Sequence, residues 1–226
     1  MANDTSTRPA LDQGLLELRE NLLRLFSLTE LQIQRAVEAL KSRGETLARE
    51  VVEKDAHANE LRYAVEHGAL RLIATQQPAA RDLRYILACI HIAVELERMA
   101  DHASGIAEIS LRIGHQPLVK PLIDIPRMQG IACAMLRNAT SAFINLDGTS
   151  VVSIAKDDDE LDQLYTQVLR ELLTYMMQDH STISQATMLL WVAHNLERIG
   201  DRIVNVCERI QFAVQGELGD YRPESA

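Results

Sequence analysis

The hexapeptide LERMAD, Leu96–Asp101, returns one hundred residues later as LERIGD, Leu196–Asp201. Around this hexapeptide, residues 83–108 align with residues 183–208 without a gap, and most of the non-identical pairs are apolar with apolar. The six identities are Ala93/Ala193, Leu96/Leu196, Glu97/Glu197, Arg98/Arg198, Asp101/Asp201 and Glu108/Glu208. Self-similarity at a fixed spacing is typical of duplicated structural units, so one unit is predicted to occur twice.

The spacing of apolar residues predicts that each unit is helical. Apolar residues recur every three or four positions along nearly the whole chain, and glycine (10) and proline (6) are scarce among the 226 residues. Interruptions of this pattern leave six predicted helices, which span residues 11–43, 46–75, 79–113, 121–147, 150–178 and 182–215. The predicted fold class is all-α, with two tandem three-helix bundles over residues 10–115 and 120–216. The segments 1–9 and 217–226 are expected to be a disordered N-terminus and a frayed tail.

Composition excludes several classes of protein. A net charge of −9 without a basic stripe argues against nucleic-acid binding. No apolar run reaches the ~18 residues of a membrane span, and the first ten residues lack the order of a signal peptide, so no direct membrane insertion is expected. The three cysteines form no C-x-x-C pair and lie in apolar helical runs, which favours buried thiols in a reducing compartment. The chain is therefore expected to be cytoplasmic.

Acidic residues interrupt the apolar stripe of the third and sixth predicted helices. The heptad stripe that begins at Leu83 runs through apolar positions and then reaches Glu97 and Asp101 without changing face. The second and fifth helices carry polar pairs at the same four-residue spacing. The eight candidate residues are Asp55 and Asn59, Glu97 and Asp101, Asp158 and Asp162, and Glu197 and Asp201.

Two such helices packed together would gather about four acids in one place. Side chains at i and i+4 point the same way, with Cβ atoms ~5–6 Å apart, and like charges repel more strongly when they leave water. Protonation, pairing with cations or a bound metal would relieve the repulsion. Arg98 and Arg198 are next to the acids in sequence but ~100° around the helix, so each is expected to reach one carboxylate at most. Because the pattern is duplicated, metal binding is favoured over a merely solvated acidic face.

At this point the chain resembles the PhoU family of bacterial phosphate-signalling regulators, over about residues 10–215. The resemblance rests on four stretches: TQQPAARDLR (75–84), ELERMADHASGIAE (95–108), LDQLYTQVLRELLTYMMQD (161–179) and NLERIGDRIVNVCE (195–208). It implies two PhoU-type bundles, with metal held by Glu97/Asp101 facing Asp55/Asn59 and by Glu197/Asp201 facing Asp158/Asp162. The first repeat has Asn59 where the second has Asp162, and Gly105 where the second has Asn205, so it lacks a possible oxygen ligand. The second site is therefore expected to bind metal more tightly. All-oxygen ligands suit Mg²⁺, Mn²⁺ or iron, with zinc also admitted, and the sequence does not rank them.

The resemblance also implies a non-enzymatic role. PhoU-like proteins are associated with the ATPase subunit of the phosphate ABC transporter and with a membrane sensor histidine kinase, and they keep the phosphate-starvation response off when phosphate is plentiful. The sequence agrees, because it offers no nucleophile–base pair and no phosphate-cradling glycine loop. Two alternatives stay open at this stage: a carboxylate-bridged metalloenzyme of a helical-bundle type, and a metal-free scaffold whose acids bind a basic partner surface. Self-association as a homodimer is also left open.

Overall fold

The computed structural model describes residues 8–216 and shows six long helices there. They are α1 (Pro9–Ser42), α2 (Glu45–Gln76), α3 (Ala80–Ile113), α4 (Asp124–Asn145), α5 (Val151–Gln178) and α6 (Ile183–Gln215), with a 3₁₀ turn η1 (His180–Thr182) before α6. The predicted all-α fold is therefore confirmed. Of the expected disordered and frayed termini, only Arg8 and Pro9 are described. The prediction was wrong for Pro9, which begins α1 and suits a first helical position.

The ends of the helices follow local chemistry. The fourth helix begins at Asp124, three residues later than predicted, because Pro126 fits only the first turn of a helix; in a longer helix it would lose a hydrogen bond and clash with the carbonyl of Leu122. Gly114 ends α3 with a φ of 58°, as its lack of a Cβ allows. At the ends of α1 and α4 the left-handed residue is not a glycine but Arg43 and Leu146, respectively.

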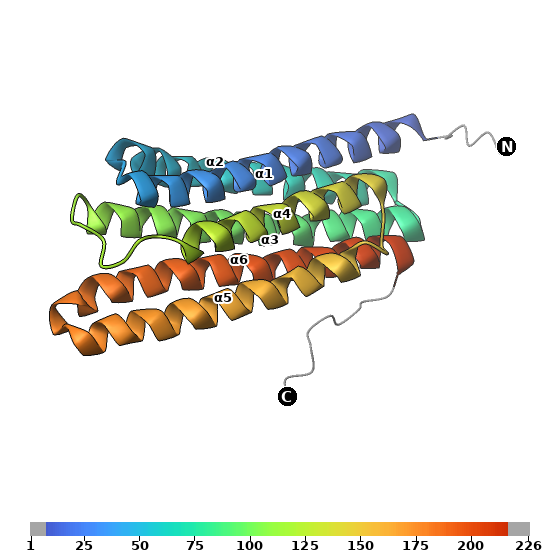
Figure 1. The fold of residues 1–226 in the computed structure, drawn as a ribbon. Coiled ribbons are helices and arrows are strands. Elements are labelled where there is room, and N and C mark those ends of the chain that lie inside the picture. Colours follow the sequence, from blue (N-terminus) through green and yellow to red (C-terminus); the bar gives the residue numbers. More distant parts are fainter. Residues whose placement is uncertain (1–7, 217–226) are drawn as a thin grey trace.

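All six helices run along one common axis, and the two repeats lie side by side (Figure 1). The third helix packs against α1, α2 and α6, and α6 packs against α3, α4 and α5, so α3 and α6 form the centre of the molecule. α1 also contacts α4, and the rings of Phe26, Phe143 and Tyr85 stack where these helices meet α3. The core consists mainly of leucine, isoleucine, valine and alanine, and all three cysteines are buried in it as free thiols. No helix within residues 8–216 is long and apolar enough to cross a membrane.

The interface between α3 and α6 has an internal twofold pattern. Glu95 of α3 pairs with Arg202 at 3.4 Å and accepts a hydrogen bond from Asn205 at 3.3 Å, both from α6. At the equivalent positions with the helices exchanged, Asn195 of α6 is 2.9 Å from His102 Nδ1 of α3. Exchange of partners between equivalent positions is the mark of an isologous interface. The duplicated units therefore pack against each other as two symmetric subunits would, within one chain.

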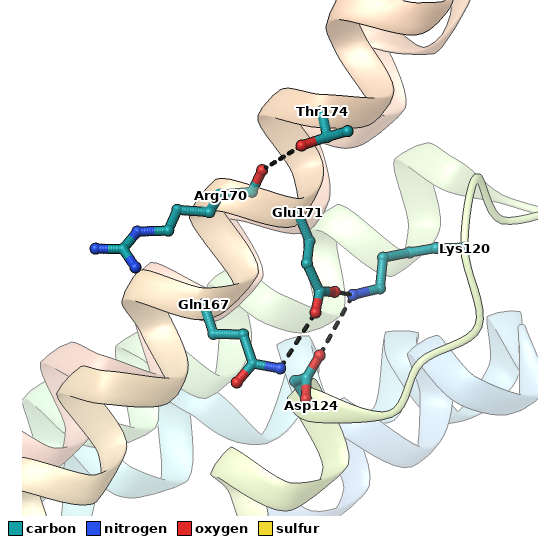
Figure 2. Close-up of polar contacts among 6 residues, drawn as sticks. All are labelled: Lys120, Asp124, Gln167, Arg170, Glu171 and Thr174. Carbon is teal, nitrogen blue, oxygen red and sulfur yellow. Dashed lines mark hydrogen bonds and ion pairs between the residues drawn. The ribbon is translucent and has the colours of Figure 1, made fainter.

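The segment between the repeats is fixed to the second bundle by buried polar groups. Gln185 accepts a hydrogen bond from Val119 N at 2.6 Å and donates one to Pro117 O at 3.0 Å. Figure 2 shows the ammonium of Lys120 between the carboxylates of Asp124, 3.3 Å away, and Glu171. Lys120 and Asp124 keep only 11% and 10% of their side chains exposed. An ion pair removed from water in this way becomes costly when one partner is lost.

We expect Lys120→Ala to lower the free energy of unfolding by about 1–3 kcal/mol, because it leaves the Asp124 carboxylate buried without a cation. Lys156→Ala removes the same charge from an exposed position of α5 and serves as the control. Urea unfolding at pH 7 measures both variants. Equal midpoints for the two variants would contradict the importance assigned to this ion pair.

Candidate metal centres

The second repeat brings four acids to the junction of α5 and α6. Asp158 and Asp162 lie on α5, and Glu197 and Asp201 lie on α6. Asp158 packs directly over Gly200: a Cβ at residue 200 would be 2.3 Å from Asp158 Oδ1 and 2.5 Å from Leu161 Cδ2. Because Leu161 is fully buried, the packing of the core brings the carboxylate of Asp158 against α6. The missing Cβ of Gly200 makes this close approach sterically allowed.

Three of the four acids, Asp158, Asp162 and Glu197, have a raised pKa. Burial, followed by the charges of Asp162, Asp201 and Glu197, raises the pKa of Asp158 from its ordinary value to about 7. Burial and Asp201 also raise the pKa values of Asp162 and Glu197. This pattern is what carboxylates show when they share a partly desolvated space with insufficient positive charge. These raised pKa values agree with the mutual repulsion expected in the second repeat.

Positive charge near these acids comes mainly from Arg198 of the same helix. Its Nη1 is 2.6 Å from Asp201 Oδ2 and 4.0 Å from Glu197 Oε1, so Arg198 reaches two carboxylates where one was expected. His194 Nδ1 is 3.5 Å from Glu197 Oε2, and the histidine packs against the rings of Tyr165 and Trp191. Burial and the charge of Arg198 lower the pKa of His194, which favours its neutral form. His194 is therefore positioned as a neutral nitrogen donor beside the acids.

Two buried oxygen atoms of this cluster have no hydrogen-bond partner: Asp158 Oδ1 on α5 and Glu197 Oε2 on α6. Orphaned carboxylate oxygens on both facing helices fit a hard cation, which prefers oxygen ligands. Among residues 8–216, however, no group of three or more His, Cys, Asp or Glu side chains is already arranged to hold a metal ion. The donor set and its charge suit a cation, and chelation would require the carboxylates to turn toward a common centre.

The first repeat is arranged differently. Burial and the charge of Asp101 raise the pKa of Asp55, and burial and Glu97 raise that of Asp101, so these acids also crowd one another. Asn59 Nδ2 donates to its own helix, at Asp55 O, over 3.4 Å. One buried acidic oxygen without a hydrogen bond remains here, Asp55 Oδ1.

An arginine that the sequence analysis did not identify lies between α2 and α3. Arg62 Nη1 donates to Glu66 Oε1 over 2.9 Å, and Arg62 Nε is 3.4 Å from Glu97 Oε1 in an ion pair. The side chains of Arg62 and Glu97 are 20% and 15% exposed. The only sequence signal for this contact was the i, i+4 spacing of Arg62 and Glu66 on the face of α2 that carries Asp55 and Asn59.

The prediction that the acids lie on the core stripe itself was wrong. The buried stripe of α3 runs through Ile92, Leu96, Met99 and Ala103, next to the stripe that contains Glu97. The two acids of α3 therefore lie at the margin of the core, where Glu97 is partly buried and Asp101 is exposed. Because α3 packs against three other helices, its buried face is broader than a heptad seam, and the spacing within one helix does not locate its centre.

One other expectation needs correction. Asn205, considered a further oxygen ligand in the second site, contacts Glu95 of the other repeat. This contact lies in the interface between α3 and α6, which the sequence of a single helix does not reveal. Arg98 reaches one carboxylate, within the limit expected for it, and that carboxylate is Glu95 of its own helix, 3.5 Å away.

Comparison with known proteins identifies the family. The family model described as the PhoU domain matches the chain twice, over residues 22–110 and 125–210. The chain belongs to the PhoU family. The resemblance seen in the sequence motifs is thereby confirmed. The PhoU family consists of non-catalytic regulatory proteins, so the prediction that the chain is not an enzyme is confirmed as well, and the metalloenzyme alternative is excluded.

Individual PhoU proteins match over nearly the whole chain. The phosphate-specific transport system accessory protein PhoU homolog of Clostridium acetobutylicum is 36% identical over 218 residues, which cover 95% of this chain and 98% of the relative. The corresponding PhoU protein of Escherichia coli K12 is 34% identical, over 92% of this chain and 86% of the relative. The crystal structure of PhoU from Pseudomonas aeruginosa superposes with a TM-score of 0.87 at 32% identity, over 91% of this chain and 99% of that one. The crystal structure of the phosphate transport system regulatory protein PhoU from Streptococcus pneumoniae superposes with a TM-score of 0.86 at 31% sequence identity. This match covers 93% of this chain and 99% of that one.

We expect Gly200→Ala to destabilise the protein by about 1–3 kcal/mol, because the new methyl group overlaps Asp158 Oδ1 and Leu161 and forces α5 away from α6. Gly130→Ala is the matched control, since nothing lies within 4 Å of a Cβ at that position of α4 and alanine is the better helix former. Chemical unfolding measures both. A Gly200→Ala protein as stable as Gly130→Ala would show that the two helices are not in tight contact at Asp158.

We also expect the stability of the metal-free protein to fall as the pH rises. A carboxyl whose pKa is raised by folding stabilises the folded state below its unfolded value, here 3.8, and this contribution is lost as the pH rises through about 7. Asp158→Asn, which cannot ionise, should therefore raise the melting temperature at pH 8 by a few degrees, raise it less at pH 5 and change it little below pH 3.8. The control is Asp157→Asn, exposed on the same helix. Melting of EDTA-treated protein gives the comparison, and indistinguishable Asp158→Asn and Asp157→Asn profiles would refute the crowding of carboxylates.

Proposed function

We propose that this PhoU-family chain is a cytoplasmic, metal-binding helical adaptor that represses phosphate uptake and the phosphate-starvation response. It would act between the ATPase subunit of the phosphate ABC transporter and the sensor histidine kinase. The observation that carries the regulatory part is the similarity to PhoU proteins over more than nine-tenths of the chain. The relatives are described as accessory proteins of the phosphate-specific transport system. The proposed partners follow from that relationship.

The metal part of the proposal rests on the second repeat. Asp158, Asp162, Glu197 and Asp201 would hold the cation, and the two orphaned oxygens, one from each helix, support this assignment. A divalent or trivalent ion such as Mg²⁺, Mn²⁺, iron or Zn²⁺ would neutralise the acids. Because its ligands come from α5 and α6, the ion would also tie these helices together. Asp55, Asn59, Glu97 and Asp101 form the corresponding, weaker candidate set in the first repeat.

A bound ion would change the acidic face from a repelling cluster to a rigid, less negative surface. The net charge of −9 makes the protein a poor partner for acidic surfaces, and neutralisation of four carboxylates would alter this locally. Metal occupancy is therefore proposed to control which face of the adaptor its partners can bind. The metal-free scaffold alternative differs in one respect: its acids would contact a basic partner surface directly.

Elemental analysis of protein purified without a metal-affinity tag tests the metal site. We expect the bound metal to fall at least tenfold in Glu197→Ala/Asp201→Ala, since two of the four proposed ligands are lost. The matched control, Asp157→Ala/Glu160→Ala, removes the same charge from exposed positions of α5 and should keep its metal. Metal that persists undiminished in the first variant would rule out the assignment.

Expression of a phosphate-starvation reporter tests the regulatory role in the same experiment. We expect a strain without the protein, and a strain carrying Glu197→Ala/Asp201→Ala, to express the reporter in phosphate-rich medium. The strain with the control variant should repress it. Normal repression in the strain without the protein would contradict the proposed function, and loss of repression without loss of metal would favour the metal-free scaffold.

A further inference from the structure

The two acidic clusters differ not only in Asn59 and Asp162 but also in whether the outer helix, α2 or α5, supplies an arginine beside the acids. The alignment that pairs Asp55 with Asp158 and Asn59 with Asp162 pairs Arg62 of α2 with Tyr165 of α5. The same alignment superposes the buried stripes of the two helices: Ala58, Leu61 and Val65 correspond to Leu161, Leu164 and Val168. Arg62 and Tyr165 therefore occupy equivalent places beside the acids of α3 and α6.

Arg62 is fixed in its place from two helices. Its guanidinium donates to Glu66 of α2 over 2.9 Å, pairs with Glu97 of α3 at 3.4 Å, and lies 4.5 Å from the centre of the Tyr63 ring. With 20% of the side chain exposed, this cation is partly removed from water, where its attraction to the carboxylates is stronger. It thus connects α2 to α3 electrostatically, which is the role proposed for a metal ion between α5 and α6.

In the second repeat, α5 has no lysine or arginine at the position equivalent to Arg62. Tyr165 is uncharged, and its ring lies 6.0 Å from that of His194. Arg198 does pair with Asp201, but it belongs to the same helix as its partner and its side chain is 36% exposed. Its ion pairs, with Asp201 and Glu197, lie within α6, and the buried oxygens Asp158 Oδ1 and Glu197 Oε2 have no hydrogen bond.

We propose that Arg62 is the permanent counter-ion of the first repeat and excludes metal from it, so that the chain binds metal only between α5 and α6. This inference rests on the proposed metal site of the second repeat. Arg62 takes Glu97, which a metal would need as a ligand, and its positive charge repels a second cation. One duplicated site has thus become a structural ion pair, while the other keeps the capacity to bind and release a metal.

Mn²⁺ binding to EDTA-stripped, full-length protein tests the assignment, with free Mn²⁺ counted by its electron paramagnetic resonance signal. We expect Glu197→Ala/Asp201→Ala to abolish the bound Mn²⁺ of the native chain and Glu97→Ala/Asp101→Ala to leave it unchanged. Substitutions that exchange Arg62 and Tyr165 should also exchange the Mn²⁺ binding of the two repeats. Arg62→Tyr should gain Mn²⁺ that a further Glu97→Ala/Asp101→Ala removes, and Tyr165→Arg should weaken binding at least tenfold.

Matched controls separate this effect from loss of structure. Arg71→Tyr makes the same substitution on α2 at an arginine whose side chain is 69% exposed and should bind Mn²⁺ as the native chain does. If Arg62→Tyr does not fold, Arg62→Gln removes the charge with a smaller change and should show the same gain. Loss of native Mn²⁺ binding in Glu97→Ala/Asp101→Ala, or no gain in either Arg62 variant, would overturn the proposal.

The melting temperature of the metal-free variants keeps this inference distinguishable from the proposed function. Without metal, Arg62→Tyr should melt below Arg71→Tyr, because Glu66, Glu97 and Asp101 then face one another without a guanidinium. A native chain that binds no Mn²⁺ would refute the proposed metal site, and the melting comparison would still decide whether Arg62 is a counter-ion. Equal melting temperatures for the two arginine variants would refute that role.

Discussion

The packing of α5 against α6 holds the carboxylate of Asp158 against the helix that carries Glu197 and Asp201, and the proposed metal site depends on that constraint. Leu161, fully buried, lies next to Asp158, and Gly200 supplies the space into which the carboxylate fits. The apolar contacts of the core favour close packing, whereas the charges oppose it. A cation bound between the helices would remove this conflict, since its attraction would act in the same direction as the apolar packing.

The two repeats contain equivalent copies of this arrangement of acids, and the copies differ in the residues around them. At the interface between the repeats the copies remain nearly symmetric, with Glu95 and Asn195 each contacting the other central helix. At the outer helices they diverge, because Arg62 pairs with Glu97 in the first repeat and the equivalent residue of the second repeat is the uncharged Tyr165. A fixed guanidinium cannot dissociate, whereas a metal ion can. If the second repeat binds metal as proposed, its occupancy could therefore vary, whereas the charge of Arg62 in the first repeat could not.

The sequence predicted the helices well because their signals are local. Five of the six predicted helices begin and end within two residues of the observed ones, and the exception, the start of α4, follows from Pro126. The repeated acidic pairs were also visible, since the i, i+4 spacing directs both members of each pair to one face. What the sequence did not show was set by packing between helices. The acids lie beside the core stripe because α3 contacts three neighbours, and the contacts of Arg62 and Asn205 depend on long side chains that reach another helix.

Nuclear magnetic resonance titration of the Asp and Glu side-chain carboxyl carbons tests the central claim most directly. In the metal-free protein, Asp158 should titrate with a midpoint of about 7, and Asp162 and Glu197 should also titrate above their ordinary values. Saturating Mg²⁺ or Zn²⁺ should lower these midpoints, because a bound cation favours the ionised carboxylates. An Asp158 midpoint near 3.8, unchanged by metal, would show that the acids do not crowd one another and need no cation.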